Sequence, residues 1–482
     1  MAELLKNYIN GSFEKPKGSN VQVIKSPVSG EELYKATDAI DEEVDAAANA
    51  ASKAQKSWRD KTAWERADIC HQIADAFEKN KEKLGKALTK EQGKPYESEA
   101  IPGIEETAEN FRIAAEDVKR QETAIIPSMD KNKRIFTFRE PHGVYACIIP
   151  WNFPTLMLSE FMAPAIAAGN TVIFKPSEWT PGILSLIAEL FDQETDLPNG
   201  VFNLLYGAGD VGQKLVEHPQ VEGIGFIGHY KTADIISRHA GVKPTILEAS
   251  GNGPTIICED ADLEKAAKEV VEAGFYCAGQ VCCSTARVIV NEKIHDEFSA
   301  KVVKEAEKWK LGDPNDPETT VGPMNNEPTA QKMQNHVEDA VKKGAKVLVG
   351  GKRDENYPTD LYFQPTVIDN VGTDTLIHQH ETFGPIVPFI SAKDDEEAIK
   401  IANDSYLGLQ SAVYTKDSSR AFKFMNSLKT GNIVINENSN YWEPHCPFGG
   451  AAGTSTGKGR IGGRYTMLDM TELRTVTWDF SE

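Results

Sequence analysis

Hydrophobic and polar positions follow two patterns in the first third of the chain. Residues 7–35 hold short alternating stretches with turn residues between them, which predicts strands. From residue 41, apolar side chains recur every three or four positions and predict amphipathic helices over residues 44–58, 63–77, 84–90 and 105–118. The turn-like segment 127–133 precedes an alternating stretch, residues 134–139, that predicts another strand.

From residue 143, short and continuously apolar runs alternate with helical ones. The apolar runs predict buried strands at residues 144–149, 171–174, 201–205, 223–227 and 245–248. Helices are expected between them at residues 156–168, 181–191, 212–217 and 233–240. Apolar strands that alternate with helices are typical of a parallel sheet covered on both faces. The pattern therefore predicts an α/β fold of the kind that binds nucleotides.

A second α/β alternation follows residue 248. Its helices are expected at residues 263–272, 294–309, 329–343, 396–403 and 418–428, and its strands at residues 287–290, 346–349 and 431–436. The last alternating stretch, residues 472–480, predicts an extended strand. Paired with residues 134–139, it would form a projecting β unit.

Composition narrows the class of protein. A chain of 482 residues is long enough for two or more domains, and 40% hydrophobic with 26% charged residues is ordinary for a soluble protein. A formal charge of −20 argues against nucleic acid or anionic membranes as partners. Seven cysteines without regular spacing suggest reduced thiols. With no signal-peptide pattern and no apolar run of about 18 residues, a cytoplasmic location is expected.

The candidate chemistry centres on three thiols within residues 274–284. Cys277, Cys282 and Cys283 lack the C-x-x-C spacing of metal or redox sites, and adjacent cysteines rarely form a disulfide. Buried free cysteine is the favoured interpretation of Cys277 and Cys283. Cys282 differs because Gly279-Gln280 precede it at a turn, where a thiol can face a cleft and act as a nucleophile.

A carboxylate at the end of a predicted strand gives this thiol a partner. The strand at residues 245–248 ends on Glu248 and is followed by a glycine-rich loop. On its own, Glu248 would be better interpreted as an ordinary solvated residue at a turn. Because Cys282 lies nearby in the sequence, we interpret Glu248 as a carboxylate directed into the same crevice.

Together these two stretches resemble the aldehyde dehydrogenase superfamily, in which Glu-Leu-Gly-Gly precedes a catalytic Gly-Gln-x-Cys loop. Further matching motifs run along the chain: Pro150-Trp151-Asn152-Phe153-Pro154, Phe174-Lys175-Pro176-Ser177-Glu178, Glu381-Thr382-Phe383-Gly384-Pro385 and Pro447-Phe448-Gly449-Gly450. The resemblance implies a Rossmann-like NAD-binding domain (1–118 and 142–249), a catalytic domain (250–468) and an oligomerisation β unit (119–141 and 469–482). A homodimer or homotetramer is therefore expected.

The resemblance also implies a mechanism for oxidising a small aldehyde to its carboxylic acid. Cys282 would attack the aldehyde carbon, and the Asn152 amide with the Cys282 backbone N–H would stabilise the thiohemiacetal oxyanion. Glu248 would then activate water to hydrolyse the thioester. No metal site is expected.

For the cofactor, the resemblance implies NAD, with NADP less favoured. The residues expected to bind it are Ile149, Pro150, Trp151, Lys175, Ser177, Glu178, Gly207, Gly209, Gly212, Phe226, Gly228, His229, Glu381 and Phe383. Glu178, beside the adenosine ribose, would repel a 2′-phosphate. His229 stands where relatives commonly carry a serine, and it either donates to the pyrophosphate or simply packs.

The substrate pocket is expected to be lined by residues from several segments: Glu106, Phe153, Met157, Glu160, Val281, Cys283, Trp442, His445 and Phe448. Several acids and no obvious arginine cluster favour a polar, hydroxylated or cationic aldehyde, and an aromatic aldehyde is the second choice. The ending Gly459-Arg460-Ile461-Gly462-Gly463 is similar to the benzaldehyde and vanillin branch, and Ile461 replaces a glutamate of many hydrolytic relatives.

Two other functions stay open at this point. A CoA-acylating aldehyde dehydrogenase would pass the acyl group to CoA, but such relatives generally lack the glutamate found here as Glu248. The other alternative is a structural relative without catalytic activity. Against it stands the retention of five residues that the family uses: Cys282, Glu248, Asn152, Lys175 and Glu381.

Overall fold

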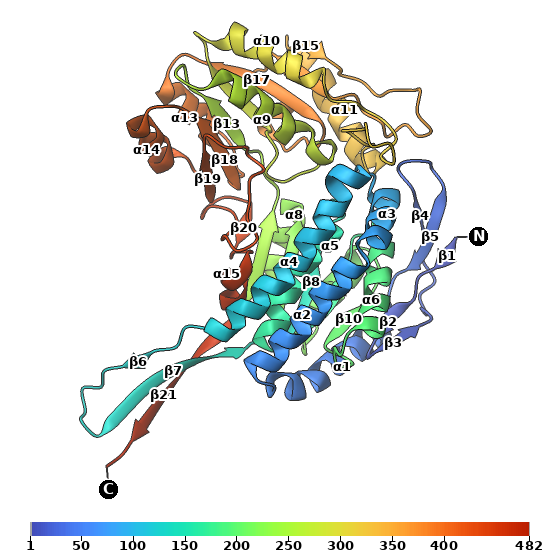
Figure 1. Cartoon of the computed structure of the whole chain (residues 1–482), viewed down its shortest axis with the longest axis vertical. Coiled ribbons are helices and arrows are strands. Elements are labelled where there is room, and N and C mark those ends of the chain that lie inside the picture. The colour runs from blue at the N-terminus through green and yellow to red at the C-terminus, as the bar shows by residue number, and fades with distance from the viewer. Residues whose placement is uncertain (1, 482) are drawn as a thin grey trace.

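The computed structural model describes residues 2–481, and its largest sheet has eight strands in the order β20-β12-β11-β8-β9-β10-β2-β3 (Figure 1). These strands are β2 (Asn7–Ile9), β3 (Ser12–Glu14), β8 (Val144–Ile148), β9 (Thr171–Lys175), β10 (Phe202–Leu204), β11 (Gly223–Gly228), β12 (Thr245–Ala249) and β20 (Gly457–Lys458). The five central strands, β12 to β10, are parallel, and the strands at both edges are antiparallel. The predicted parallel α/β fold is confirmed.

Helices cover both faces of this sheet. They are α1 (Asp41–Arg59), α2 (Ala63–Lys79), α3 (Lys81–Gln92), α4 (Ile101–Asp117), α5 (Pro154–Ala168), α6 (Gly182–Glu194), α7 (Gly209–Glu217) and α8 (Tyr230–His239). Side chains of α1, α7 and α8 form one core cluster against the sheet, and those of α2 to α6 form another.

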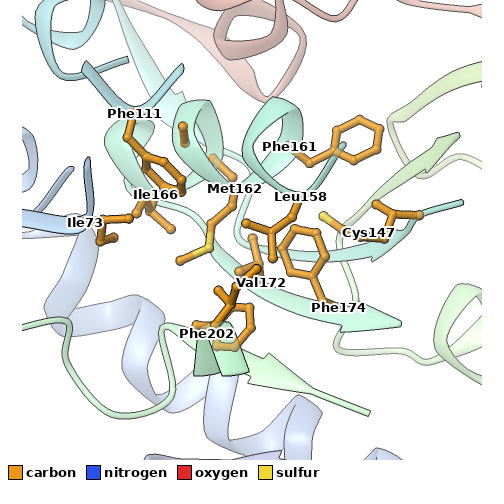
Figure 2. Close-up of a cluster of buried hydrophobic side chains, with 14 of the residues drawn as sticks. Ile73, Phe111, Cys147, Leu158, Phe161, Met162, Ile166, Val172, Phe174 and Phe202 are labelled. Atoms are coloured by element: carbon orange, nitrogen blue, oxygen red, sulfur yellow. The ribbon is translucent and has the colours of Figure 1, made fainter. Parts of the chain in front are cut away.

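Helix α5 is buried along almost its whole length, which explains why apolar residues occur all round it. Figure 2 shows Leu158, Phe161 and Met162 of α5 packed over Cys147 and Phe174 of the sheet. Gly225 of β11 permits this close packing, because a Cβ there would lie 3.0 Å from the Phe161 ring. The first element after β8 is thereby fixed on the sheet.

A second sheet has seven strands in the order β15-β16-β17-β14-β13-β18-β19. The strands are β13 (Pro254–Ile257), β14 (Arg287–Asn291), β15 (Lys346–Val349), β16 (Thr366–Asp369), β17 (Ile386–Ala392), β18 (Gln410–Tyr414) and β19 (Asn432–Ile435). Its helices are α9 (Leu263–Phe275), α10 (His295–Ala306), α11 (Glu327–Lys342), α12 (Leu376–Gln379), α13 (Asp395–Asn403) and α14 (Ser418–Ser427). All pairs are parallel except β15 with β16.

The sequence patterns identified β14, β15 and β19 but missed β13, β16, β17 and β18. Strand length does not explain this difference, because β13 and β16 are four residues long and so are β15 and β19, which the patterns identified. Helix α10 also ends at Ala306, three residues before the predicted end.

Two small sheets complete the described chain. β1 (Glu3–Leu4), β4 (Val21–Lys25) and β5 (Glu32–Thr37) form one, and β6 (Ile125–Ile126), β7 (Lys133–Pro141) and β21 (Thr471–Asp479) form an arm that projects from the body (Figure 1). Helix α15 (Gly463–Asp469) leads into β21. The predicted pairing of β7 with β21 is confirmed over nine residues, while its role in oligomerisation and the three domain boundaries stay predictions.

No helix within residues 2–481 combines the length and apolar character needed to cross a membrane. All seven cysteines carry free thiols, and Cys277 and Cys283 are buried as predicted.

Candidate active site

A cavity of about 570 Å³ collects residues from both large sheets. Its walls come from segments that directly follow β8, β11, β12 and β19, and from the loop after α9. The carboxyl ends of parallel strands are where α/β proteins bind ligands. Sixteen of the predicted site residues line it: Glu106, Pro150, Trp151, Asn152, Phe153, Met157, Gly228, His229, Glu248, Val281, Cys282, Cys283, Glu381, Phe383, Trp442 and Phe448.

The loop that carries Cys282 has an unusual backbone. After α9, Cys277 and Ala278 both adopt a left-handed φ of +52°, a conformation that costs energy for residues other than glycine. Gly279 follows with φ +67°, and a Cβ there would lie 2.0 Å from the carbonyl oxygen of Gly384. The loop therefore packs directly on the Glu381–Pro385 motif.

Gln280 fixes this strained loop, a positioning role that the sequence patterns did not reveal. Its side-chain Nε2 donates to the Cys277 carbonyl at 2.8 Å, and its Oε1 accepts from the Asn325 N–H at 2.8 Å. The Gln280 carbonyl in turn accepts from the Asn152 side-chain Nδ2 at 2.9 Å. Asn152, which is buried, is held beside the loop with one amide hydrogen committed and another left for a ligand.

Glu248 is buried in the cavity wall, and its Oε1 has no hydrogen-bond partner in the described part of the chain. Burial raises the pKa of Glu248 to about 7, against a smaller lowering by the Cys282 thiol. An unpartnered buried carboxylate oxygen is costly unless a ligand or water meets it. With a pKa near neutrality, Glu248 suits a general base.

The Cys282 thiol is neutral in this environment. A hydrogen bond with Cys283, burial and the nearby Glu248 and Glu381 carboxylates raise the pKa of Cys282 well above its usual value. A base therefore speeds attack by this sulfur, and Glu248 lines the same cavity.

The glycine-rich loop after Glu248 contacts both the Cys282 loop and Glu381, a predicted cofactor residue. A Cβ on Gly251 would lie 1.9 Å from the Cys282 carbonyl oxygen, so only glycine fits there. The Gly251 N–H donates to Oε1 of Glu381 at 2.8 Å. Farther along the wall, the Trp151 and Phe383 rings meet edge to face at 5.5 Å, and the Lys332 ammonium lies over Phe383.

Eight predicted cofactor residues lie outside this cavity: Ile149, Lys175, Ser177, Glu178, Gly207, Gly209, Gly212 and Phe226. The Lys175 ammonium donates to the carbonyls of Pro176 and Gly207 at 2.9 and 2.8 Å. Ser177, Glu178 and Gly207 line a small separate hollow together with Asp38.

The geometry beyond the cavity fits a dinucleotide. Helices α7 and α8 start directly after the loops that leave β10 and β11, and helix N-termini offer unpaired N–H groups to phosphate. No atom lies within 4 Å of where a Cβ on Gly209 would be, so a phosphate can approach the start of α7.

His229 is the first residue before α8, and its Nδ1 accepts from the Lys231 N–H at 3.4 Å. Burial and the charges of Lys332 and Lys231 lower the pKa of His229, so the ring is neutral. With Nδ1 as acceptor, Nε2 carries the proton. The ring also packs on Tyr230, with the ring centres 4.6 Å apart. Both predicted roles of His229, packing and donation of a hydrogen bond to the cofactor pyrophosphate, are therefore compatible with the structure.

Glu160 and His445 do not line the cavity, contrary to prediction. Glu160 is buried behind it, where Oε1 accepts from the Asn110 amide at 2.6 Å. Burial raises the pKa of Glu160 well above its usual value, so it is a neutral acid. His445 is exposed and pairs with Glu443 at 3.2 Å.

The cavity also has walls that were not predicted as substrate contacts, among them Glu272, Tyr276, Glu437 and Asn438. Tyr276 lies within the thiol-rich segment, and its closeness to Cys282 in the sequence was the one feature that could have predicted it as a wall residue.

Outside the cavity, Glu443, His445 and Cys446 each bring a potential metal ligand within 4.8 Å of the others. The sequence analysis predicted no metal site, and Glu443 is already occupied by His445 and Tyr441.

Comparison with known proteins agrees with this geometry. The sequence profile of the Aldehyde dehydrogenase family matches residues 13–476. The chain is 36% identical to a lactaldehyde dehydrogenase of Methanocaldococcus jannaschii, over 94% of this chain and 96% of that protein. It is 36% identical to an NADP-dependent glyceraldehyde-3-phosphate dehydrogenase of Streptococcus equinus, with both chains fully covered. A betaine aldehyde dehydrogenase of Staphylococcus aureus, solved in complex with NAD+, superimposes with a TM-score of 0.94 at 32% identity, covering 99% of this chain and 95% of that one.

The chain therefore belongs to the aldehyde dehydrogenase family. The predicted fold and the predicted class of enzyme, an NAD(P)-dependent oxidoreductase that acts on aldehydes, are confirmed. Because the relatives include NADP-dependent enzymes as well as one solved with NAD+, the preference for NAD stays a prediction.

Proposed function

We propose that this protein oxidises an aldehyde to the free carboxylic acid with NAD, through a thioester on Cys282. The observation that carries the proposal is that Cys282, Glu248 and Asn152 line one cavity, whose wall also holds Trp151, Glu381 and Phe383. A nucleophile, a base and an oxyanion donor around one space are the parts that acyl transfer requires.

Cys282 attacks the aldehyde carbon after its thiol proton has passed to Glu248, the unpartnered base in the same cavity. The oxyanion that forms is stabilised by the free amide hydrogen of Asn152 and by the Cys282 backbone N–H. Loss of one such donor typically slows catalysis about 10²–10³-fold. Gln280 keeps the Asn152 amide in place before the substrate arrives.

A bound nicotinamide dinucleotide supplies the hydride acceptor for the oxidation. Trp151, Glu381 and Phe383 would contact it in the cavity, and the start of α7 near Gly209 would meet its phosphates. Lys175 and Glu178 would hold the adenosine ribose. The negative charge of Glu178 disfavours a 2′-phosphate, which is why NAD is the proposed cofactor.

Hydrolysis, rather than transfer to CoA, is proposed as the final step. Glu248 first releases the thiol proton to solvent, and its unpartnered buried oxygen can then hold and deprotonate a water molecule next to the thioester. Ile461, which replaces the glutamate of many hydrolytic relatives, lines the cavity as an apolar residue. Glu248 is therefore the carboxylate that we assign to ordering this water.

The substrate is proposed to be polar, hydroxylated or cationic, and the acids in the cavity wall support this choice over an anionic aldehyde. Among the relatives, some are named for lactaldehyde or betaine aldehyde and others for the anionic succinate semialdehyde or glyceraldehyde 3-phosphate, so the choice rests on the cavity wall. An aromatic aldehyde is the second candidate, supported by the C-terminal Gly-Arg-x-Gly-Gly sequence and by the Trp442 and Phe448 side chains.

The β arm is proposed to join copies of the chain into a dimer or tetramer. Ile125, Leu473 and Trp478 expose between 56% and 83% of their surface on it. Apolar side chains exposed together on a projecting sheet are typical of an interface.

The test is NADH or NADPH formation by the purified protein over a panel of aldehydes, with NAD and NADP in parallel and with or without CoA. Turnover with NAD alone that yields the free acid is expected. Turnover that requires CoA would contradict the hydrolytic step. No turnover with any aldehyde would favour the alternative that the protein is a catalytically silent structural relative.

A further inference from the structure

The substrate half of the cavity carries negative charge only. Glu106, Glu272 and Glu437 line it. Among the described residues of its wall, the basic side chains are His229 and Lys332, and both lie on the cofactor side near Tyr230 and Phe383. A substrate tail that extends away from the nicotinamide therefore meets carboxylates without a neighbouring cation in the wall.

The cations nearest to these acids in the sequence or the fold are engaged elsewhere. Arg112 pairs with Glu78 at 3.3 Å on the outer side of α4, and His445 pairs with Glu443. Lys94 lies behind the wall, with its ammonium 3.8 Å from the Phe153 ring centre. Lys94 lowers the pKa of Glu106 but does not line the cavity.

Glu106 is the acid best placed to recognise a ligand. It is half-buried on α4 and forms no ion pair with another described side chain, whereas Glu437 lies 4.0 Å from Lys265 and Glu272 is exposed. A partly desolvated carboxylate that has no ion pair of its own binds a cation more strongly than a solvated one, because water screens it less.

The remaining wall suits an aliphatic stem that ends in a cation. Phe153, Met157, Tyr276, Trp442 and Phe448 supply apolar and aromatic surface in the same cavity as Cys282 and the acids. The buried Nε1 of Trp442 has no hydrogen-bond partner among the described residues, and its ring offers a π face. Aromatic faces attract ammonium groups, most strongly where water is excluded.

We propose that the substrate is an aldehyde with a positively charged amino group at the end opposite the carbonyl, and that Glu106 selects it. The proposal rests on the proposed function, because it assumes that Cys282 attacks a substrate in this cavity. An anionic tail would meet three carboxylates, and a neutral one would leave the half-buried Glu106 without an ion-pair partner.

The proposal predicts that the preference for a cationic substrate changes with pH. Burial raises the pKa of Glu106 to about 7. The groups that face it are Lys94, the neutral acid Glu160 and the Tyr276 hydroxyl, whose own pKa is raised by burial. An alkylammonium stays charged throughout pH 6–8, so preference for the cationic substrate should grow as Glu106 loses its proton.

The experiment compares kcat/KM for aldehydes matched in size, in wild type and in Glu106→Gln. The first series is 3-aminopropanal, 3-hydroxypropanal, butanal and succinate semialdehyde. A longer pair, 4-(trimethylammonio)butanal and 5,5-dimethylhexanal, covers a greater distance from Cys282. Glu105→Gln is the matched control, because Glu105 lies on the same helix and pairs outside the cavity with Lys81.

In wild type, the cationic member of each series should be the best substrate, and its advantage over the neutral one should rise from pH 6 to pH 8. Glu106→Gln should reduce kcat/KM for the cation about 10- to 100-fold, leave the neutral aldehyde nearly unchanged and abolish the pH trend. Equal or better use of the neutral, hydroxylated or anionic aldehydes would overturn this inference alone. Failure with all of them would instead count against the proposed function.

Discussion

Glu248→Gln tests the central chemical claim, because it keeps the size of the side chain and removes its basicity. Glu248 is 2% exposed, and its pKa is raised to about 7 by burial. About one Glu248 in ten is therefore ionised at pH 6 and about nine in ten at pH 8. If this carboxylate activates water, steady-state turnover should rise roughly tenfold between these pH values.

In Glu248→Gln, steady-state turnover should fall about 10²–10⁴-fold, the usual contribution of a general base, and the rise with pH near 7 should vanish. Stopped-flow fluorescence should still record an initial burst of NADH close to one per active site. The burst survives because Cys282 can lose its proton to solvent, more slowly, while the thioester waits for water that no base activates.

Two controls accompany the measurement. Cys282→Ala should give no burst, and Glu355→Gln, which changes an exposed residue away from the cavity, should behave like wild type. A Glu248→Gln enzyme that keeps the wild-type steady-state rate, or keeps its pH profile, would refute the assignment of Glu248 as the base.

Three further predictions follow from the contacts of the site. Asn152→Ala should lower kcat about 10²–10³-fold because one oxyanion donor is lost, and an unchanged kcat would remove Asn152 from that role. Glu178→Gln should narrow the preference for NAD over NADP by about tenfold in kcat/KM, since one repulsive charge is removed; a constant ratio would contradict a position beside the ribose. Gly279→Ala should destabilise the protein by about 2 kcal/mol or more, measured by denaturant unfolding. Gly241→Ala is its control, because Gly241 has a similar φ of +62° but open space around the new Cβ. An equal loss of unfolding free energy in both variants would show that the contact with Gly384 does not contribute.

The sequence by itself determined the parallel strands of the first sheet and pointed to three candidate catalytic side chains. Apolar runs such as residues 144–149 and 223–227 are long and uniform enough to predict buried strands. Cys282, Glu248 and Asn152 lie in motifs whose residue types and order are specific, so they were identified without coordinates. The pairing of β7 with β21 was likewise readable from the alternation of both segments.

The tertiary structure decided which acids face the cavity. Met157 and Glu160 lie on one helix, three residues and about 60° apart around its axis. Because α5 is buried on all sides, that rotation turns Met157 toward the cavity and Glu160 toward Asn110 behind it. Periodicity cannot distinguish the faces of a helix that has no solvent face.

Only the fold also brings Glu106, Glu272 and Glu437 to one wall, from α4, the end of α9 and the segment after β19. The raised pKa values of Glu106 and Glu248 come from burial, which is a property of the packed chain. Local sequence thus specified the candidate reactive groups, because their chemistry belongs to residue types. The charge and shape around them were set by long-range packing, because desolvation and the direction of each side chain depend on neighbours far away in the chain.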